Sequence, residues 1–340
     1  MRQLQKDLQT SFLAIALTLF CFSTKAADAP PERAISNGVI SARLYLPNAE
    51  SGYYRGARFD WSGVVSRLDY AGHNFFGVWF PHYEPTINDA ITGPVEEFRS
   101  ADGALGYGEA KPGGMFVKIG VGVLQKPDEK PYAFGRDYKI LSTGKWVIRP
   151  SSDRVEFVQD LEGVNGYSYV YTKKVWMVKG KPELVLEHTL KNTGKREIDT
   201  EVYDHDFYVI DGQPTGPAFS VKFVFPPKVK DDLKDAAQVR GKDIVYLREL
   251  AARKDSAASY LEGYNDQPSD NDIRVENSKA GVGVEERGDH PISKLYLWSI
   301  RTTVCPEAYI ALHIPPGKKG KWQIRYRFYK LGEESAAVKK

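Results

Sequence analysis

The sequence predicts an all-β protein built from antiparallel strands. From residue 39 onward, short runs alternate apolar and polar residues, are rich in Val, Ile, Tyr, Phe and Thr, and end at Gly, Pro, Asn or Asp. The chain has 20 Tyr, 16 Phe and 6 Trp against 3 Met, a balance that suits pleated sheets better than helical bundles. No strand–helix–strand alternation is found, so a parallel doubly wound sheet is not expected.

Ten segments carry the clearest strand pattern. In the last of them, apolar side chains from Trp322 to Phe328 alternate with polar ones. The predicted strands are 39–46, 116–124, 145–149, 155–161, 167–178, 184–190, 219–225, 294–301, 309–314 and 322–329. Helical periodicity is confined to 229–239 and 247–257, which predicts a few short surface helices there.

The N-terminus has the features of a secretory signal peptide, predicted to cover residues 1–26. Arg2 and Lys6 precede an apolar run at 11–23, and small residues follow it, which favours cleavage after Ala26. That run is too short to span a bilayer, which needs about 20 apolar residues, and none later in the chain approaches that length. We therefore expect a periplasmic or secreted protein without a membrane span.

Residues 27–340 are predicted to form a single domain, because no interior linker or change of composition divides them. The tail 332–340 is expected to be frayed. Cys21 lies in the predicted signal peptide, so the mature chain would keep only Cys305 and could form no intramolecular disulfide. Its stability must then come from the core, in which we expect Cys305 to be buried.

Composition and motifs exclude several classes of function. The formal charge of +3 falls to +1 when residues 1–26, which carry Arg2, Lys6 and Lys25 against Asp7, are removed. A nucleic-acid-binding protein would normally be more basic. The sequence has no GxGxxG, GxxxxGK[ST], HExxH, GxSxG or CxxC motif, and none of its six His pairs with another at metal-ligand spacing. We expect no cofactor and no metal.

The richest polar cluster is 202–212, in which Asp204 and Asp206 flank His205 near the end of a predicted strand. A carboxylate beside an imidazole can fix its tautomer and raise its pKa, which suits a general acid. Strand alternation also allows His205 to be a hydrogen-bonded core residue, so the cluster alone leaves both interpretations open.

A second candidate is Glu307, which follows Pro306 at the start of an otherwise apolar strand. A carboxylate at the mouth of a sandwich can be partly desolvated and act as a base. A solvated strand-end residue or a charge that protects a sheet edge would look the same.

The order of these segments resembles the galactose mutarotase (aldose 1-epimerase) superfamily, and especially its hexose-6-phosphate epimerase branch. The resemblance rests on the Asn-Thr-Gly turn at 192–194, the aromatic-flanked His205 in 203–207, and the late segment 305–307 that ends in Glu307. It implies a large antiparallel β-supersandwich, with His205 as catalytic acid and Glu307 as catalytic base. It also implies that Arg58 and Asp266 hold sugar hydroxyls.

The sequence departs from the family at one point. The family carries a further His in a Gly- and aromatic-rich segment, but the matching segment 105–110 reads LGYGEA. Either Glu109, Lys111 or His73 takes that role, or the protein does not epimerise simple hexoses.

Three functions therefore stay open. The first is an exported aldose 1-epimerase-like isomerase, and the second is a non-catalytic protein that binds a sugar or oligosaccharide. The third is a glycan lyase or hydrolase that pairs Glu307 with Glu96, Glu97 or Glu109. If His205 and Glu307 act on one anomeric centre, their side chains should lie within roughly 10 Å of each other, so that both reach one sugar.

Overall fold

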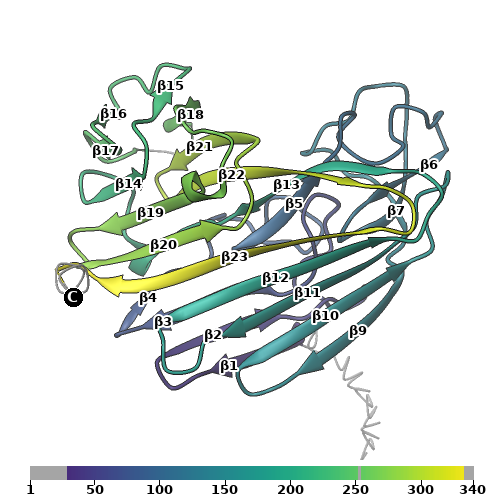
Figure 1. Ribbon diagram of the computed structural model, residues 1–340, viewed down its shortest axis with the longest axis horizontal. Helices are drawn as coiled ribbons and strands as arrows, with labels where there is room; N and C mark the ends of the chain where they lie inside the picture. Colours follow the sequence, from purple (N-terminus) through teal and green to yellow (C-terminus); the bar gives the residue numbers. More distant parts are fainter. Residues whose placement is uncertain (1–28, 252–253, 333–340) are drawn as a thin grey trace, which may run out of the picture.

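The computed structural model of the protein describes residues 29–251 and 254–332. The predicted signal peptide, 1–26, lies outside the described residues, as does 333–340 of the predicted frayed tail. Within the described part, strands dominate and no α-helix is found. Two single 3-10 turns, η1 (Ile210–Gly212) and η2 (Pro268–Asp270), are the only helical elements there (Figure 1). The all-β prediction is confirmed.

A ten-stranded sheet forms one layer, and all its neighbouring strands pair antiparallel. Its strands in spatial order are β16 (Ala237–Arg240), β17 (Asp243–Tyr246), β14 (Phe219–Phe223), β19 (Asp272–Asn277), β20 (Val282–Gly288), β23 (Lys319–Lys330), β12 (Glu183–Asn192), β11 (Tyr169–Met177), β10 (Arg154–Leu161) and β9 (Lys145–Pro150).

A six-stranded antiparallel sheet packs against it and carries the residues of the candidate site. Its strands in spatial order are β15 (Lys228–Val229), β18 (Ser256–Glu262), β21 (Lys294–Ile300), β22 (Thr303–Ile314), β13 (Ile198–His205) and β5 (Val95–Arg99).

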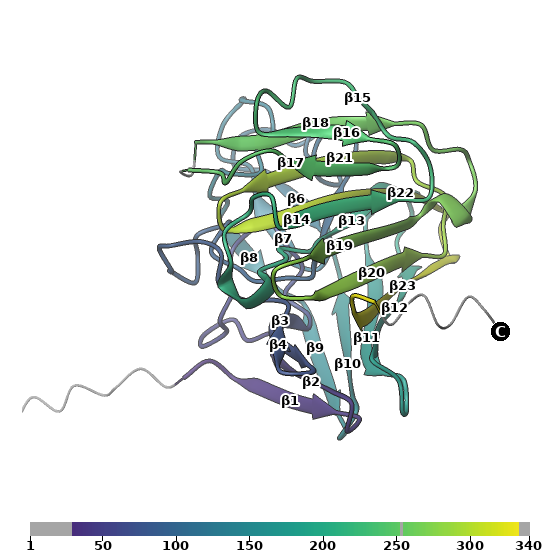
Figure 2. The same cartoon turned by 90° about the vertical axis from the view of Figure 1, so that its left-hand side faces the viewer.

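Two small sheets complete the fold. One contains β1 (Glu32–Ser36), β2 (Ile40–Tyr45), β3 (Val64–Tyr70) and β4 (His73–Asn74). The other contains β6 (Met115–Lys118), β7 (Gly122–Gln125) and β8 (Ile140–Ser142). Figure 2 shows the first of these low in the molecule, below β15, β18, β21 and β22 and at the level of β9 and β10.

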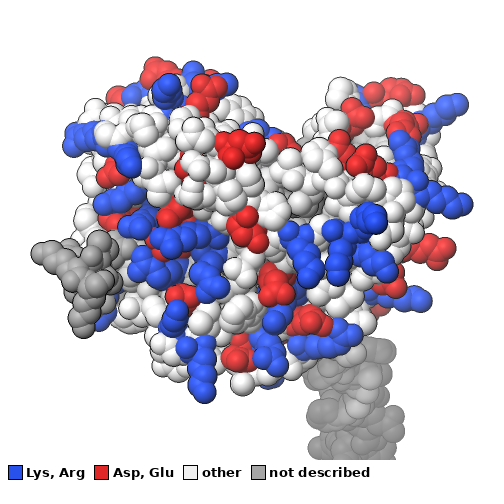
Figure 3. Space-filling view, in the orientation of Figure 1, with Lys and Arg blue, Asp and Glu red and all other residues white. Residues whose placement is uncertain are grey.

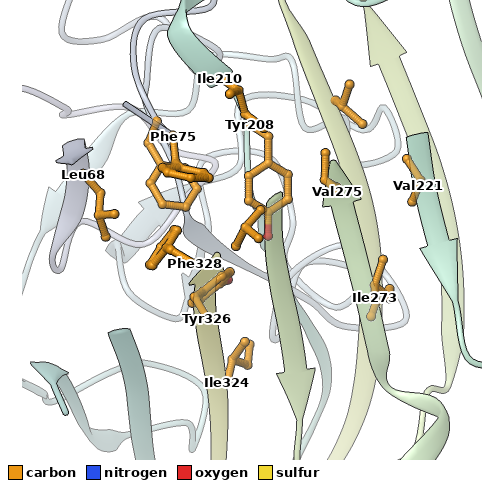
Figure 4. Packing of buried hydrophobic residues seen from close by; sticks show 14 of the residues in the cluster. Leu68, Phe75, Tyr208, Ile210, Val221, Ile273, Val275, Ile324, Tyr326 and Phe328 are labelled. Atoms are coloured by element: carbon orange, nitrogen blue, oxygen red, sulfur yellow. The ribbon is translucent and has the colours of Figure 1, made fainter. Parts of the chain in front are cut away.

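The main apolar core lies between the layers. One continuous cluster joins Leu186 and Val284 of the ten-stranded sheet to Leu297 of the six-stranded sheet and Leu68 of β3. Figure 4 shows part of this packing, where Phe75 meets Phe328 with ring centroids 4.8 Å apart. The apolar faces of three sheets are thus buried together, as a sandwich requires.

Most predicted strands coincide with observed ones, but two differ in extent. Segment 116–124 is not one strand, because β6 and β7 form a hairpin around Gly120 (φ +79°) and Gly122 (φ +148°), conformations that favour glycine. Strand β22 begins at Thr303 rather than at residue 309. Glu307 therefore lies inside a strand and not at its start.

The prediction of helices at 229–239 and 247–257 is wrong. The described residues of these stretches form turns and parts of the short strands β15, β16 and β18. The local pattern of acidic, basic and apolar residues resembles an amphipathic helix, but Leu233 and Ala236 are buried in the main core from a turn. Tertiary packing outweighs a weak helical preference here.

A buried polar network lies inside the sandwich, beneath β5 and β13. Glu96 of β5 stands opposite Asp204 of β13. Glu96 accepts a hydrogen bond from Lys173 of β11, and its Oε1 lies 2.6 Å from Nε2 of His188 on β12. Two strands of the ten-stranded sheet therefore hold this carboxylate. Burial alone would raise the pKa of Glu96, but Lys173 and His188 lower it to about 2.

The same network contains carboxyl groups that keep their protons. The Tyr326 hydroxyl lies 2.6 Å from Oδ2 of Asp204 and 2.9 Å from Oδ1 of Asp206. One hydroxyl hydrogen can serve only one of these oxygens, so a protonated carboxyl must supply the other bond. Burial and the neighbouring carboxyls raise the pKa of Asp204 and Asp206 well above the usual value, and burial raises that of Glu286 to about 7.

We predict that the protein loses stability between pH 7 and pH 8. These carboxyls hold protons in the folded state that they have lost in the unfolded state, where their pKa is near 4, so raising the pH favours unfolding. Each carboxyl that stays protonated contributes a slope of about 1.4 kcal/mol per pH unit. Burial lowers the pKa of His188 and His205, which titrate below this window. It also lowers the pKa of Lys118, to about 8, so Lys118 begins to titrate at the upper end of the window and opposes the carboxyl slope there by at most half a proton.

Urea unfolding at pH 7.0, 7.5 and 8.0 measures this slope. The Asp206→Asn variant keeps a neutral side chain of the same shape and should show a shallower dependence. A free energy of unfolding that is flat or rises over this range would contradict the prediction.

Candidate active site

A cavity of about 370 Å³ lies on the face of the six-stranded sheet that points away from the main core. We call it the site cavity. Strands β5, β13, β18, β21 and β22 supply part of its wall, and the segments around residues 58, 79, 89 and 134 supply the rest. It is lined by Arg58, Trp79, Asp89, Arg99, Phe134, His205, Tyr260, Tyr296, Trp298, Glu307 and Tyr309.

Strand register brings His205 and Glu307 together. Along β13, Asp204 points into the sandwich, so His205 on the next position points into the cavity. Val202 pairs with Ile310 on β22, which places Glu307 beside His205. Nε2 of His205 lies 3.4 Å from Oε1 of Glu307, and each residue is only 4% exposed.

Aromatic rings fix the imidazole of His205. It stacks on Phe207 with ring centroids 3.7 Å apart, and the edges of Phe59 and Trp298 pack around it at 5.7 and 5.5 Å. Its Nδ1 is buried and has no hydrogen-bond partner in the described chain. His205 is therefore not a fully hydrogen-bonded core residue, because its polar contact is Glu307 at the cavity.

The backbone at this end of β13 is also tightly held. Phe207 has φ +47°, which is uncommon for a non-glycine residue and turns its ring under the imidazole. Gly93 passes so close that an added Cβ would lie 2.4 Å from the carbonyl oxygen of His205. A side chain at position 93 would therefore displace the catalytic candidate.

Burial shifts the pKa values of Glu307 and His205 in opposite directions. It raises the pKa of Glu307 to about 7, against the lowering effect of Arg58 and Arg99. Burial lowers the pKa of His205 well below its usual value, and Arg58 adds to this effect. The pair consequently holds one proton just below neutral pH, and its two members face each other at 3.4 Å.

Glu97 organises the cations next to the cavity. It is completely buried and accepts hydrogen bonds from Nε of Arg58 at 2.9 Å, from two nitrogens of Arg99 at 3.0 Å, and from the Tyr203 hydroxyl at 2.6 Å. Nζ of Lys118 lies 3.5 Å away. Burial would raise the pKa of Glu97, but these cations hold it well below the usual value.

The two arginines reach the cavity from this anchor. Nη1 of Arg58 donates to Asp89 at 2.7 Å, and both guanidinium groups lie over the ring of Phe134, at 4.3 and 5.2 Å from its centroid. Arg58, expected from the family resemblance, thus lines the same cavity as His205 and Glu307.

Three other expected binding residues lie elsewhere. Asp266 is exposed in the loop before η2, Glu109 pairs at the surface with Arg196, and His73 pairs with Asp211 beside β4. None of the three lines the site cavity, so their expected contact with substrate has no support in this geometry. None of the three lies in a strand of the six-stranded sheet, so strand pairing does not bring them to the cavity.

The carboxylate pairs expected for a glycan hydrolase are not assembled either. Glu96 faces the interior of the sandwich, Glu97 has its oxygens occupied by cations, and Glu109 is at the surface. The carboxyl groups that line the site cavity are Glu307 and Asp89.

Several residues of the site cavity were not predicted from the sequence. Trp298 lies within a correctly predicted strand, where alternation with Tyr296 places both on one face, so this signal was available. Asp89 and Phe134 come from loops whose position depends on packing, and no local pattern marks them.

The residues described by the structure contain no group of three or more His, Cys, Asp or Glu side chains placed to hold a metal ion. Over residues 29–251 and 254–332, no helix is long and apolar enough to cross a membrane. Cys305 is free and buried, as expected.

No family model matches the chain, and no curated protein matches it. Solved structures are similar. A galactose mutarotase related enzyme from Lactobacillus acidophilus is 12% identical, with 88% of this chain and 98% of that chain covered and a TM-score of 0.51. The GalM/aldose epimerase homologue from C. elegans is 12% identical, with 89% and 100% covered and a TM-score of 0.52.

A third similar structure is a galactose mutarotase-like protein from Clostridium acetobutylicum. It is 11% identical, with 88% of this chain and 95% of that chain covered and a TM-score of 0.53. The chain has the galactose mutarotase-like fold, which confirms the fold that the sequence resemblance implied.

We predict that Glu97→Gln strongly destabilises the protein. The substitution leaves three buried or half-buried cations without their shared counter-charge, and breaking a buried pair in this way typically costs about 3–5 kcal/mol. Urea unfolding monitored by tryptophan fluorescence measures the loss. Glu109→Gln, which breaks an exposed pair, is the matched control and should change stability little. Equal effects of the two substitutions would contradict the anchoring role of Glu97.

Proposed function

We propose that the protein is an aldose 1-epimerase-like isomerase that interconverts the anomers of an unphosphorylated sugar. One observation carries the proposal: His205 and Glu307 lie 3.4 Å apart in an aromatic-walled cavity of a galactose mutarotase-like fold. Fold alone does not determine function, so the chemistry must come from this pair.

The reaction needs one base and one acid. Glu307, as carboxylate, takes the proton of the anomeric hydroxyl while the C1–O5 bond breaks, and O5 receives a proton from Nε2 of His205. The open aldehyde then rotates about C1–C2. Closure on the other face of the carbonyl returns a proton from Glu307 to O1 and the O5 proton to His205, so both groups regain their starting state.

The pair must hold one proton for this cycle. In its reactive form the proton is on His205 and Glu307 is ionised. The opposite pKa shifts favour the other one-proton form, neutral imidazole with protonated carboxyl, in the empty cavity. The two forms differ by one proton transfer across the His205–Glu307 contact, and a bound hydroxyl group can stabilise the ionised form.

The rest of the cavity suits a neutral sugar. Arg58 and Arg99 face the ligand space but are already paired with Glu97 and Asp89. They can donate to hydroxyl groups, whereas a phosphate dianion would have to compete with these carboxylates. Trp79 and Trp298 supply aromatic surface against which the apolar face of a sugar ring can pack.

Export is part of the proposal. The basic start, the short apolar run and the small residues before position 27 support a cleaved signal peptide and a periplasmic or secreted protein. A sugar outside the cytoplasm is also more often unphosphorylated, which agrees with the paired cations of the cavity.

We predict that the wild-type protein accelerates anomer interconversion and that Glu307→Gln and His205→Asn each lower kcat by about 10²–10⁴, the range expected for loss of a general acid or base. Polarimetry and NMR on freshly dissolved aldoses and reducing oligosaccharides measure the rate. Glu109→Gln, far from the cavity, should leave it unchanged. Sugar binding without acceleration would favour the carbohydrate-binding alternative, and release of a new reducing end would favour hydrolysis.

We also predict a bell-shaped pH dependence of kcat/KM for this reaction. With the pKa of Glu307 raised to about 7, the shared proton is lost as the pH rises above that value, and the acid of the pair disappears. At low pH the pair gains a second proton and loses its base. A rate that keeps rising from pH 7 to pH 9 would contradict the one-proton requirement.

A further inference from the structure

The site cavity continues into a second hollow along the same sheet face. This hollow, of about 750 Å³, shares Arg99 and Phe134 with the site cavity. We call it the outer hollow, and the two together the groove. Figure 3 shows the molecular surface hollowed between two raised lobes, in the orientation in which Figure 1 places β15 to β18 on one side and the β6–β7 region on the other.

Strand alternation lays out the floor of the groove. On β13, the side chains at positions 205, 203, 201 and 199 share one face, and on β22 those at 307, 309, 311 and 313 do. Asp199 pairs in register with His313, and Glu201 with Ala311. Six residues of strand extend about 20 Å, which is more than one pyranose ring needs.

Two features keep the groove open beyond the catalytic pair. Ala311 is exposed and has the smallest side chain of the four on β22, so the floor drops there. Phe134 is 45% exposed at the junction of the two hollows, although two guanidinium groups hold its ring. A rigid, partly exposed ring beside hydrogen-bonding groups is a typical surface for a sugar.

The junction also offers an uncommitted donor. Nε and Nη2 of Arg99 are bonded to Glu97, but Nη1 has no hydrogen-bond partner in the described part of the chain. Because Arg99 lines both hollows, this nitrogen can reach a ligand that extends from one to the other. Beyond it, Tyr132 leads into a third hollow of about 490 Å³.

The charges of the outer hollow are balanced within it. Its lining has two cations, Arg99 and Lys294, and two carboxylates, Asp199 and Glu201, with Lys294 2.5 Å from Glu201. No excess of positive charge is left to attract an anionic glycan. Hydroxyl-rich neutral ligands suit such a surface, since they can both donate to carboxylates and accept from cations.

We propose that the substrate is a neutral oligosaccharide whose reducing-end sugar enters the site cavity while the following sugars occupy the outer hollow. A preference for longer oligosaccharides in turnover rests on the proposed function. Binding along the groove can be measured without it.

The test uses Ala311→Trp, which places a bulky ring on the floor of the outer hollow without altering a residue that lines the site cavity. Ala34→Trp is the matched control, because Ala34 is also exposed on a strand but lies in the four-stranded sheet. Probes are glucose and galactose, with reducing di- and tetrasaccharides of each in α- and β-linkage. Calorimetry gives Kd with the Glu307→Gln variant, and NMR gives kcat/KM with the wild-type catalytic pair.

We expect at least one tetrasaccharide to bind at least about tenfold more tightly than its monosaccharide, the effect of one hydrogen bond to a charged group. Ala311→Trp should remove this gain and leave monosaccharide binding unchanged, whereas Ala34→Trp should change neither the gain nor monosaccharide binding. A Kd that depends on oligosaccharide length, without turnover, would overturn the proposed function and still support oligosaccharide binding in the groove.

Other outcomes overturn the groove proposal. Turnover with no length dependence would do so while leaving the isomerase function intact. Tighter binding of tetragalacturonate than of every neutral tetrasaccharide would show that the ligand is anionic. Equal Kd values, or no detectable binding, across all lengths of every probe would show that the outer hollow does not bind oligosaccharide.

Discussion

The arrangement of the site depends on the burial of charge on both faces of β5 and β13. Glu96 and Glu97 are consecutive on β5, so one carboxylate must face the sandwich interior and the other the cavity side. Neither is in contact with water, and a buried charge is tolerated only with close partners. Lys173 and His188 fix β5 from within the sandwich, and Arg58 fixes it from the cavity side. His205 takes its position from β13, which pairs with this doubly anchored strand.

How much of the fold could be predicted from the sequence depended on how strands are exposed. Strands with one wet face alternate clearly, and β10, β11 and β23 were predicted almost to their ends, although β18 and β19 alternate equally and were not predicted. Strand β22 is buried at every position from Thr303 to Ile310, so its first half shows no alternation and was predicted too short. Strand β5 is also buried on both faces along most of its length, so it shows no alternation and was not predicted.

The candidate site was predictable only where its residues lie in strands. His205 and Glu307 were singled out because polar groups stand out in apolar segments, and register then brought them together. Asp89 and Phe134 reach the cavity through loop packing, which no periodicity records. The histidine expected in segment 105–110 is not replaced by another histidine at the site. Among the described residues that line the cavity, His205 is the single histidine.

Glu97 connects the stability of the site to its chemistry. Arg58 and Arg99 lower the pKa of both Glu307 and His205, while the negative charge of Glu97 raises both. If the two cations were unopposed, both members of the pair would lose protons more readily, and the one-proton state would move to lower pH. The carboxylate that anchors the arginines therefore also limits their electrostatic effect. It allows guanidinium groups to line the cavity while Glu307 keeps a pKa near 7, where a single proton can pass between base and acid.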